Sequence, residues 1–187
     1  PISKGEAGFH HDVGEKISSI LSSSGLNETV TFSFMHPDQL KKLLFKDGDA
    51  VYNAVPILNP ITEDFPLMRT TLVPTLMDVL VRNQAVKNPS VGIYEIAPVY
   101  RPKQLPLTEL PEQEFYVSGL LYGQRTPAEW PAKAENYDFY DVKGLVEAVL
   151  QGLGIQADLE VSDWALLHPG KAARYVKDGK VLCDFGE

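Results

Sequence analysis

The sequence predicts an α+β protein in which an antiparallel, or at most mixed, sheet is flanked by helices. Residues 91–100 and 115–122 are rich in β-branched and aromatic residues, which favours two long strands that follow each other along the chain. Three other segments carry apolar residues at helical spacing. These helical segments separate groups of strands instead of alternating with single strands, so an antiparallel sheet is expected rather than a parallel one.

The three main helices are expected over residues 12–21, 72–87 and 139–153. Their apolar residues recur every three or four positions, and glycines follow the first and third segments closely. Pro74 is compatible with the second helix because it falls in the first turn, where its missing N–H costs nothing. A shorter helix is expected to open at Pro37.

Further strands are expected over residues 29–35 and 51–58, the second interrupted by Pro56, which cannot donate to a ladder. The tail from residue 157 onward reads as three strands, and the last two flank Asp178-Gly179. An Asp-Gly pair between apolar runs predicts a hairpin with a type I′ turn, because both central residues need positive φ.

The connection between the two long strands contains three prolines and is too stiff for a tight hairpin turn. These prolines are Pro102, Pro106 and Pro111. We therefore expect a long antiparallel pair whose connection protrudes from the sheet.

Composition limits the function classes that fit the chain. A length of 187 residues is enough for one domain with a sizeable core. The formal charge of -8 argues against an autonomous RNA-binding module, because such proteins carry a basic surface. No apolar run approaches the roughly 20 residues of a membrane helix, and the single cysteine fits a reducing, cytoplasmic compartment.

The chain begins at Pro1 and stops at Glu187, directly after a strand-like apolar run. No secretory signal pattern precedes the first helix. We expect residues 1–187 to be a single core domain excised from a larger protein and truncated at its C-terminal end.

The histidines and the cysteine have structural explanations that compete with chemical ones. His10 and His11 are expected in a solvated turn before the first helix, with Asp12 as its cap, since nothing nearby completes a metal site. His168 could titrate at the mouth of a Pro-Gly turn, although a structural turn is the stronger interpretation. Cys183 lies in an alternating apolar strand and is expected in the core.

Two other groups of residues suggest chemistry only weakly. The acidic residues Glu109, Glu112 and Glu114 could bind a cation, but they are expected mainly to keep the neighbouring loop solvated. Glycine spacing matches neither of the common phosphate-binding motifs. The residues themselves therefore predict no catalytic, cofactor or metal site.

Several short motifs together resemble the bacterial-type phenylalanyl-tRNA synthetase beta subunit, over nearly the whole chain. In order, they are Asn59-Pro60, Leu67-Met68-Arg69-Thr70, Leu72-Val73-Pro74, Arg82-Asn83, Tyr94-Glu95-Ile96-Ala97-Pro98-Val99-Tyr100, His168-Pro169-Gly170-Lys171-Ala172 and the closing Asp184-Phe185-Gly186-Glu187. The resemblance concerns the catalytic-like core of that subunit and implies a class II aminoacyl-tRNA synthetase-like fold.

The resemblance implies a place in an α2β2 enzyme that joins phenylalanine to its tRNA with ATP and magnesium. The alpha subunit then performs the chemistry, and the editing module of the beta subunit lies elsewhere. Arg101 resembles an arginine of motif 2, but Pro102 follows it and no matched glutamate is apparent. The Gly-x-Gly-x-x-Arg pattern of motif 3 does not occur in the sequence.

The resemblance therefore indicates a non-catalytic module whose partners are the alpha subunit and, in the full complex, tRNA. Candidate subunit-interface residues are Arg69, Leu72, Leu76, Arg82 and Arg101. An equally weighted alternative has Arg69 binding backbone carbonyls inside the domain. Exposed docking surface would also favour self-association of the isolated chain. The competing function is an independent small-molecule enzyme with a site around His168 and Arg174.

Overall fold

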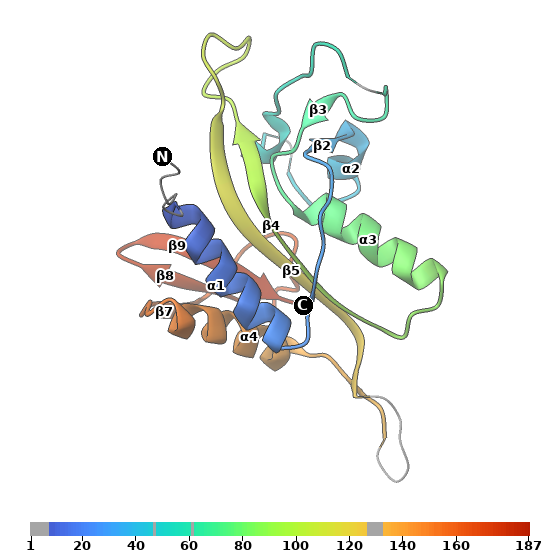
Figure 1. Cartoon of the computed structure of the whole chain (residues 1–187), viewed down its shortest axis with the longest axis vertical. Coiled ribbons are helices and arrows are strands. Elements are labelled where there is room, and N and C mark those ends of the chain that lie inside the picture. The colour runs from blue at the N-terminus through green and yellow to red at the C-terminus, as the bar shows by residue number, and fades with distance from the viewer. Residues whose placement is uncertain (1–7, 47, 61, 127–132) are drawn as a thin grey trace, which may run out of the picture.

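The computed structural model describes residues 8–46, 48–60, 62–126 and 133–187. It is organised around a long, twisted antiparallel pair, β4 (Ser90–Arg101) and β5 (Glu112–Thr126), which runs through the middle of the molecule (Figure 1). β1 (Asn27–Glu28) joins β4 in parallel, and β6 (Glu135–Asn136) joins the end of β5. The α+β class with mostly antiparallel sheets is confirmed.

Alternating side chains of β4 pack against helices on the two faces of this sheet. On one face Ile93 packs with Leu76 and Leu80 of α3 (Val73–Ala85). On the other face Tyr94 packs with Ile17 and Leu21 of α1 (Phe9–Ser23). Because both faces are covered, β4 lacks the apolar and polar alternation of a half-exposed strand.

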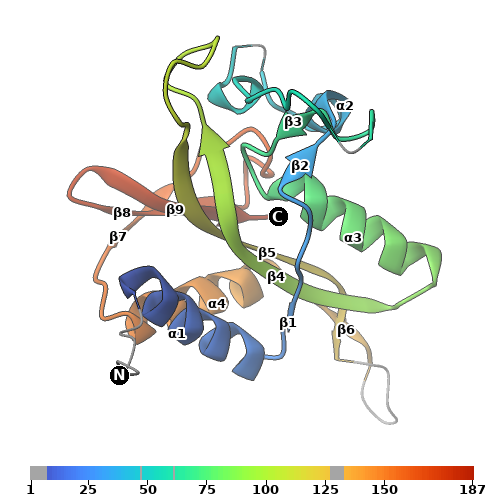
Figure 2. The ribbon, with the colours of Figure 1, turned by 45° about the horizontal axis from the view of Figure 1, so that its top comes forward.

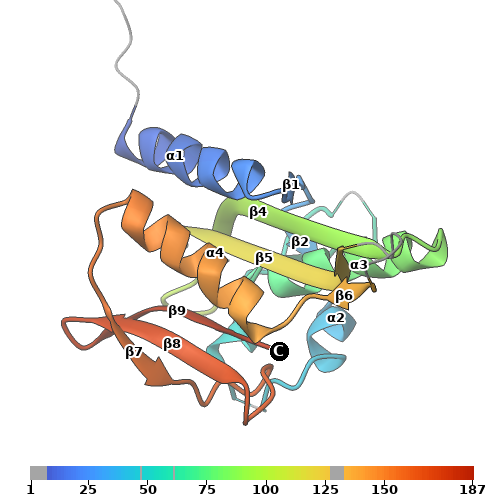
Figure 3. The same ribbon diagram turned by 90° about the horizontal axis from the view of Figure 1, so that it is seen from below.

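A second layer lies beneath α4 (Phe139–Gly152), as Figure 3 shows. One side of α4 packs towards α1, and its other side covers a three-stranded antiparallel sheet. That sheet consists of β7 (Asp158–Val161), β8 (Ala172–Lys177) and β9 (Lys180–Gly186). Asp178 and Gly179 both have positive φ, 51° and 75°, which confirms the predicted turn between β8 and β9.

A smaller cluster occupies the end of the molecule beside the proline-containing connection. It comprises β2 (Phe34–Met35), α2 (Pro37–Lys41), the short 3-10 helix η1 (Ala50–Tyr52) and β3 (Leu67–Met68). Met35 and Leu40 are buried at its centre. No helix in the described part of the chain is long and apolar enough to cross a membrane.

Two predicted strands and one predicted cap are wrong. Of residues 29–35, only Phe34 and Met35 form a strand, β2. The N–H of Thr31 bonds to the buried Glu95 carboxylate and not to the backbone of a neighbouring strand. Residues 51–58 contain η1 and a single bridge from Pro56 to Leu67. Helix α1 begins before Asp12, with Gly8 as its N-cap, so His10 and His11 lie within the helix.

Candidate functional site

A buried ion pair connects Arg69, the residue directly after β3, to the central sheet. The Arg69 guanidinium lies 2.8 Å from the carboxylate of Glu95 on β4, and each side chain is only 2% exposed. Arg69 also donates to the carbonyl oxygens of Pro98 and Phe32, at 2.9 and 3.4 Å. A planar guanidinium can satisfy several buried acceptors at once, which a lysine could not do with the same geometry.

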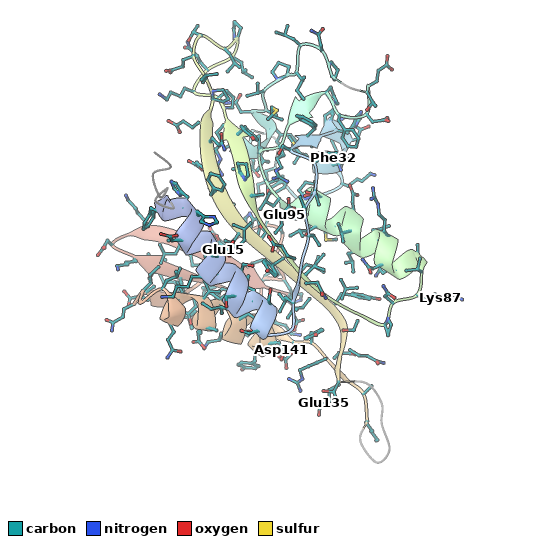
Figure 4. All side chains as sticks on the ribbon, viewed as in Figure 1. Glu15, Phe32, Lys87, Glu95, Glu135 and Asp141 are labelled. Atoms are coloured by element: carbon teal, nitrogen blue, oxygen red, sulfur yellow. The ribbon has the colours of Figure 1, made fainter. Side chains whose placement is uncertain are left out.

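The same pair anchors residues 29–33, which we call the edge segment because it continues β1 along the outer edge of the central sheet. The Thr31 hydroxyl donates to the Glu95 carboxylate at 2.8 Å and accepts from Arg69 at 3.1 Å. With Thr31 bound to the buried pair, Val30 and Phe32 are 91% and 70% exposed. Figure 4 labels Phe32 above Glu95 of β4. The buried charges thus hold the edge segment in place with two apolar side chains presented outward.

The five predicted interface residues fall into two groups. Arg69, Leu72 and Leu76 are buried within the chain, so their side chains are not available on its surface. For Arg69 the structure matches the alternative interpretation, in which it binds carbonyls inside the domain. Arg82 on α3 and Arg101 at the end of β4 are accessible to solvent, and their role in an interface remains a prediction.

Arg101 is engaged by two side chains of β5. Its guanidinium donates to the Tyr116 hydroxyl at 2.9 Å, lies 5.3 Å from the centre of the same ring, and approaches the Glu114 carboxylate at 3.7 Å. The register of β4 against β5 sets Glu112 opposite Arg101 and Glu114 diagonally across from it, a proximity that sequence spacing does not reveal. Burial is the main cause of a raised Tyr116 pKa, so this hydroxyl stays protonated near neutral pH.

The acidic residues beside the connection between β4 and β5 are balanced by a lysine. Lys103 lies 3.4 Å from Glu109 and 3.9 Å from Glu112. Within the described ranges, no group of three or more His, Cys, Asp or Glu side chains is arranged to hold a metal ion. We call residues 102–111, which connect β4 to β5, the proline loop.

The groups around His168 are occupied by structural contacts. His168 Nδ1 accepts the N–H of Gly170 at 3.1 Å, which closes the turn. Arg174 binds the carboxylates of Asp163 and Asp184, and the hydrogen bond from Arg174 lowers the pKa of Asp163. The carbonyl oxygen of His168 also accepts the N–H of Lys171 at 2.9 Å, so the contacts of this histidine are those of a structural turn.

Two of the other histidines and the cysteine also have structural contacts. His10 stacks on the Phe115 ring of β5, with the ring centres 5.5 Å apart. His36 caps α2 by accepting the N–H of Asp38 at Nδ1. Cys183 packs against the core cluster of the three-stranded sheet, as predicted, and burial raises the pKa of its thiol.

Two solved structures that resemble this fold are of an aminoacyl-tRNA synthetase. The pyrrolysyl-tRNA synthetase of Desulfitobacterium hafniense superposes in two structures, each with a TM-score of 0.62. Sequence identity is 18% and 17%, and the matches cover 92% and 93% of this chain but 56% and 57% of the synthetase chains. At this identity the likeness concerns the fold alone, and it agrees with the predicted class II synthetase-like architecture.

Sequence comparison gives a more specific result than the comparison of folds. The phenylalanine-tRNA ligase beta subunit from Geobacter metallireducens is 34% identical to this chain over 95% of its length. The beta subunit from Syntrophotalea carbinolica is 35% identical over 92% of its length. The matches span only 22% of each of these relatives. A family model described as the phenylalanyl tRNA synthetase beta chain CLM domain matches residues 1–187. The chain therefore belongs to the CLM domain family of the phenylalanyl-tRNA synthetase beta chain.

Proposed function

We propose that this chain is a non-catalytic module of a cytoplasmic phenylalanine-tRNA ligase beta subunit that docks the alpha subunit and so supports aminoacylation of tRNA. Family membership supports a role in forming phenylalanyl-tRNA. The alpha subunit is the partner that a beta subunit implies. ATP and magnesium are used by the assembled ligase and are not assigned to residues of this module.

The observation that carries the docking role is the edge segment. It continues β1 along β4 at the outer edge of the central sheet, where the N–H of Thr29 bonds to the Tyr94 carbonyl, and it presents Val30 and Phe32 to solvent. An exposed strand edge offers backbone hydrogen bonds, and its outward side chains provide selectivity for a partner strand or helix. The buried Arg69 and Glu95 pair keeps this segment ordered before binding, which lowers the entropic cost of docking.

The contacts of Arg101 support the non-catalytic part of the proposal. A nucleotide-binding arginine must turn its guanidinium towards the phosphates, where charge develops during adenylate formation. Here the guanidinium faces Tyr116 and Glu114, and Pro102 follows directly in the chain. Arg101 thus links β4 to β5 at the base of the proline loop.

Replacing Arg101 by alanine in the complete ligase tests this role. We expect kcat for tRNA aminoacylation to stay within about twofold of the unchanged enzyme, because an exposed ion pair contributes little and no reacting group is removed. The measurement is steady-state aminoacylation at saturating ATP and phenylalanine. A loss of about a hundredfold or more in kcat, with an intact complex, would place Arg101 in an active site.

A further inference from the structure

The backbone of the edge segment is only partly paired within the chain itself. The N–H of Thr29 bonds to a carbonyl of β4 at 2.8 Å, and the N–H of Thr31 bonds to the Glu95 carboxylate at 3.2 Å. Within the described ranges, the N–H groups of Val30 and Phe32 form no hydrogen bond, and neither does the Val30 carbonyl. Because successive residues of an extended chain direct these groups to opposite sides, the three unpaired groups face away from β4.

These unpaired groups lie on the outside of the sheet. β1 is the last strand on its side of the four-stranded sheet in the part of the chain that the structure describes. Figure 2 shows the chain that leaves β1 passing along the outer side of β4. Val30 and Phe32 are both largely exposed, so another chain can reach the backbone between them.

The spacing of the unpaired groups indicates which kind of element fits them. N–H groups that point outward at every second residue are the pattern to which an added β-strand bonds. A helix cannot complete this pattern, because its own N–H and C=O groups are bonded within the helix. The complementary element is therefore an extended strand.

The edge segment also lacks the features that usually prevent strand pairing. Exposed sheet edges are commonly blocked by charged side chains or by proline. Residues 29–33 read Thr-Val-Thr-Phe-Ser and contain neither. By contrast β7, at one edge of the three-stranded sheet, carries Asp158 and Glu160 among its four residues. The chain thus protects that edge with charge and leaves the edge segment open, as expected if a partner strand covers it.

We propose that the edge segment accepts an extended strand of its docking partner, which adds to the central sheet on the β1 side. This inference rests on the proposed function, which supplies the alpha subunit as the partner, and it specifies the element that the partner brings. The added strand bonds to the N–H groups of Val30 and Phe32 and packs apolar side chains against theirs. A second copy of this chain is disfavoured as the source, because each copy carries a formal charge of -8.

Residue-resolved hydrogen exchange of the chain, alone and bound to the cognate alpha subunit, tests this inference. We expect the amides of Val30 and Phe32 to exchange rapidly in the chain alone and about tenfold or more slowly in the complex. The amides of Thr29 and Thr31 are internal references, because they are already bonded in the chain alone and should change less. Equal exchange of the Val30 and Phe32 amides in the two samples would contradict an added strand.

Two substitutions at Val30 separate the contribution of the backbone from that of the side chain. Val30→Pro keeps an apolar side chain but removes the N–H, whereas Val30→Ala removes more of the side chain and keeps the N–H. We expect proline to raise Kd for the alpha subunit about tenfold or more, and alanine about threefold or less. Circular dichroism verifies that both variants remain folded. Equal Kd values for the two variants would show that the partner does not use this N–H.

The outcomes distinguish this inference from the proposed function. If the unchanged chain does not bind the alpha subunit, both are wrong. If it binds while the Val30 and Phe32 amides stay unprotected, docking stands and the added strand is wrong. If these amides are already protected in the chain alone and lose that protection on dilution, a second copy occupies the edge and the inference is wrong.

Discussion

Replacing Arg69 by methionine is expected to lower the free energy of unfolding by about 3–5 kcal/mol, because it leaves the buried Glu95 carboxylate without its cation. Typical domains are stable by about 5–15 kcal/mol, so this loss is a large fraction of the total. Urea denaturation followed by circular dichroism measures it. The edge segment should also become more mobile, since Arg69 and Glu95 both bind Thr31.

Two further variants show whether burial of the pair explains the effect. Arg101→Met removes the corresponding arginine of an exposed pair, in which both side chains are 41% exposed, and should cost at most about 1 kcal/mol. Replacing Arg69 by methionine and Glu95 by leucine together should recover part of the loss, because no unpaired charge remains. Equal costs for the Arg69 and Arg101 substitutions would contradict this explanation.

Replacing Gly123 by alanine should destabilise the protein by about 3 kcal/mol or more, through backbone strain and a steric clash. Gly123 has a φ of 79°, and a Cβ at this position would lie 2.0 Å from the carbonyl oxygen of Pro89. The Pro89 oxygen is a backbone atom directly before β4, and Gly123 lies in β5, so relief of the clash requires the two chain segments to separate at this end. Thermal and urea unfolding of the variant measure the cost.

Gly154 provides the matched control for this substitution. Its φ of 70° imposes a similar strain on alanine, but no atom lies within 4 Å of the added Cβ. Gly154→Ala should therefore cost only about 1 kcal/mol. If the two alanine variants lose the same stability, the close approach of Pro89 to Gly123 does not determine the effect.

Local patterns were sufficient to predict the main helices, the long strand pair and the final hairpin. Helix α4 illustrates why, because its apolar residues follow a helical period and Asp138 caps its start. The edge segment was not predicted correctly, since its alternation is typical of a strand while the N–H of Thr31, at its centre, bonds to a side chain. Local propensity cannot reveal that Thr31 binds a carboxylate 64 residues away.

The candidate site was predicted only in part. The importance of Arg69 could be seen in the sequence, but its burial could not, because its partner lies on a distant strand. Glu95 did carry a signal: it is the one acidic residue within the apolar strand 91–100, and a charge in such a position needs a buried cation. Val30 and Phe32 gave no comparable signal, since strand alternation alone does not tell which face is covered.

Binding of this chain to the cognate alpha subunit tests the docking role most directly. The unchanged chain is predicted to capture the alpha subunit from solution, and a variant with Val30 and Phe32 replaced by serine should lose about tenfold or more in affinity while remaining folded. Val30 and Phe32 are 91% and 70% exposed, so their replacement should cost little stability. No detectable binding by the unchanged chain, or equal binding by the variant, would contradict docking through the edge segment.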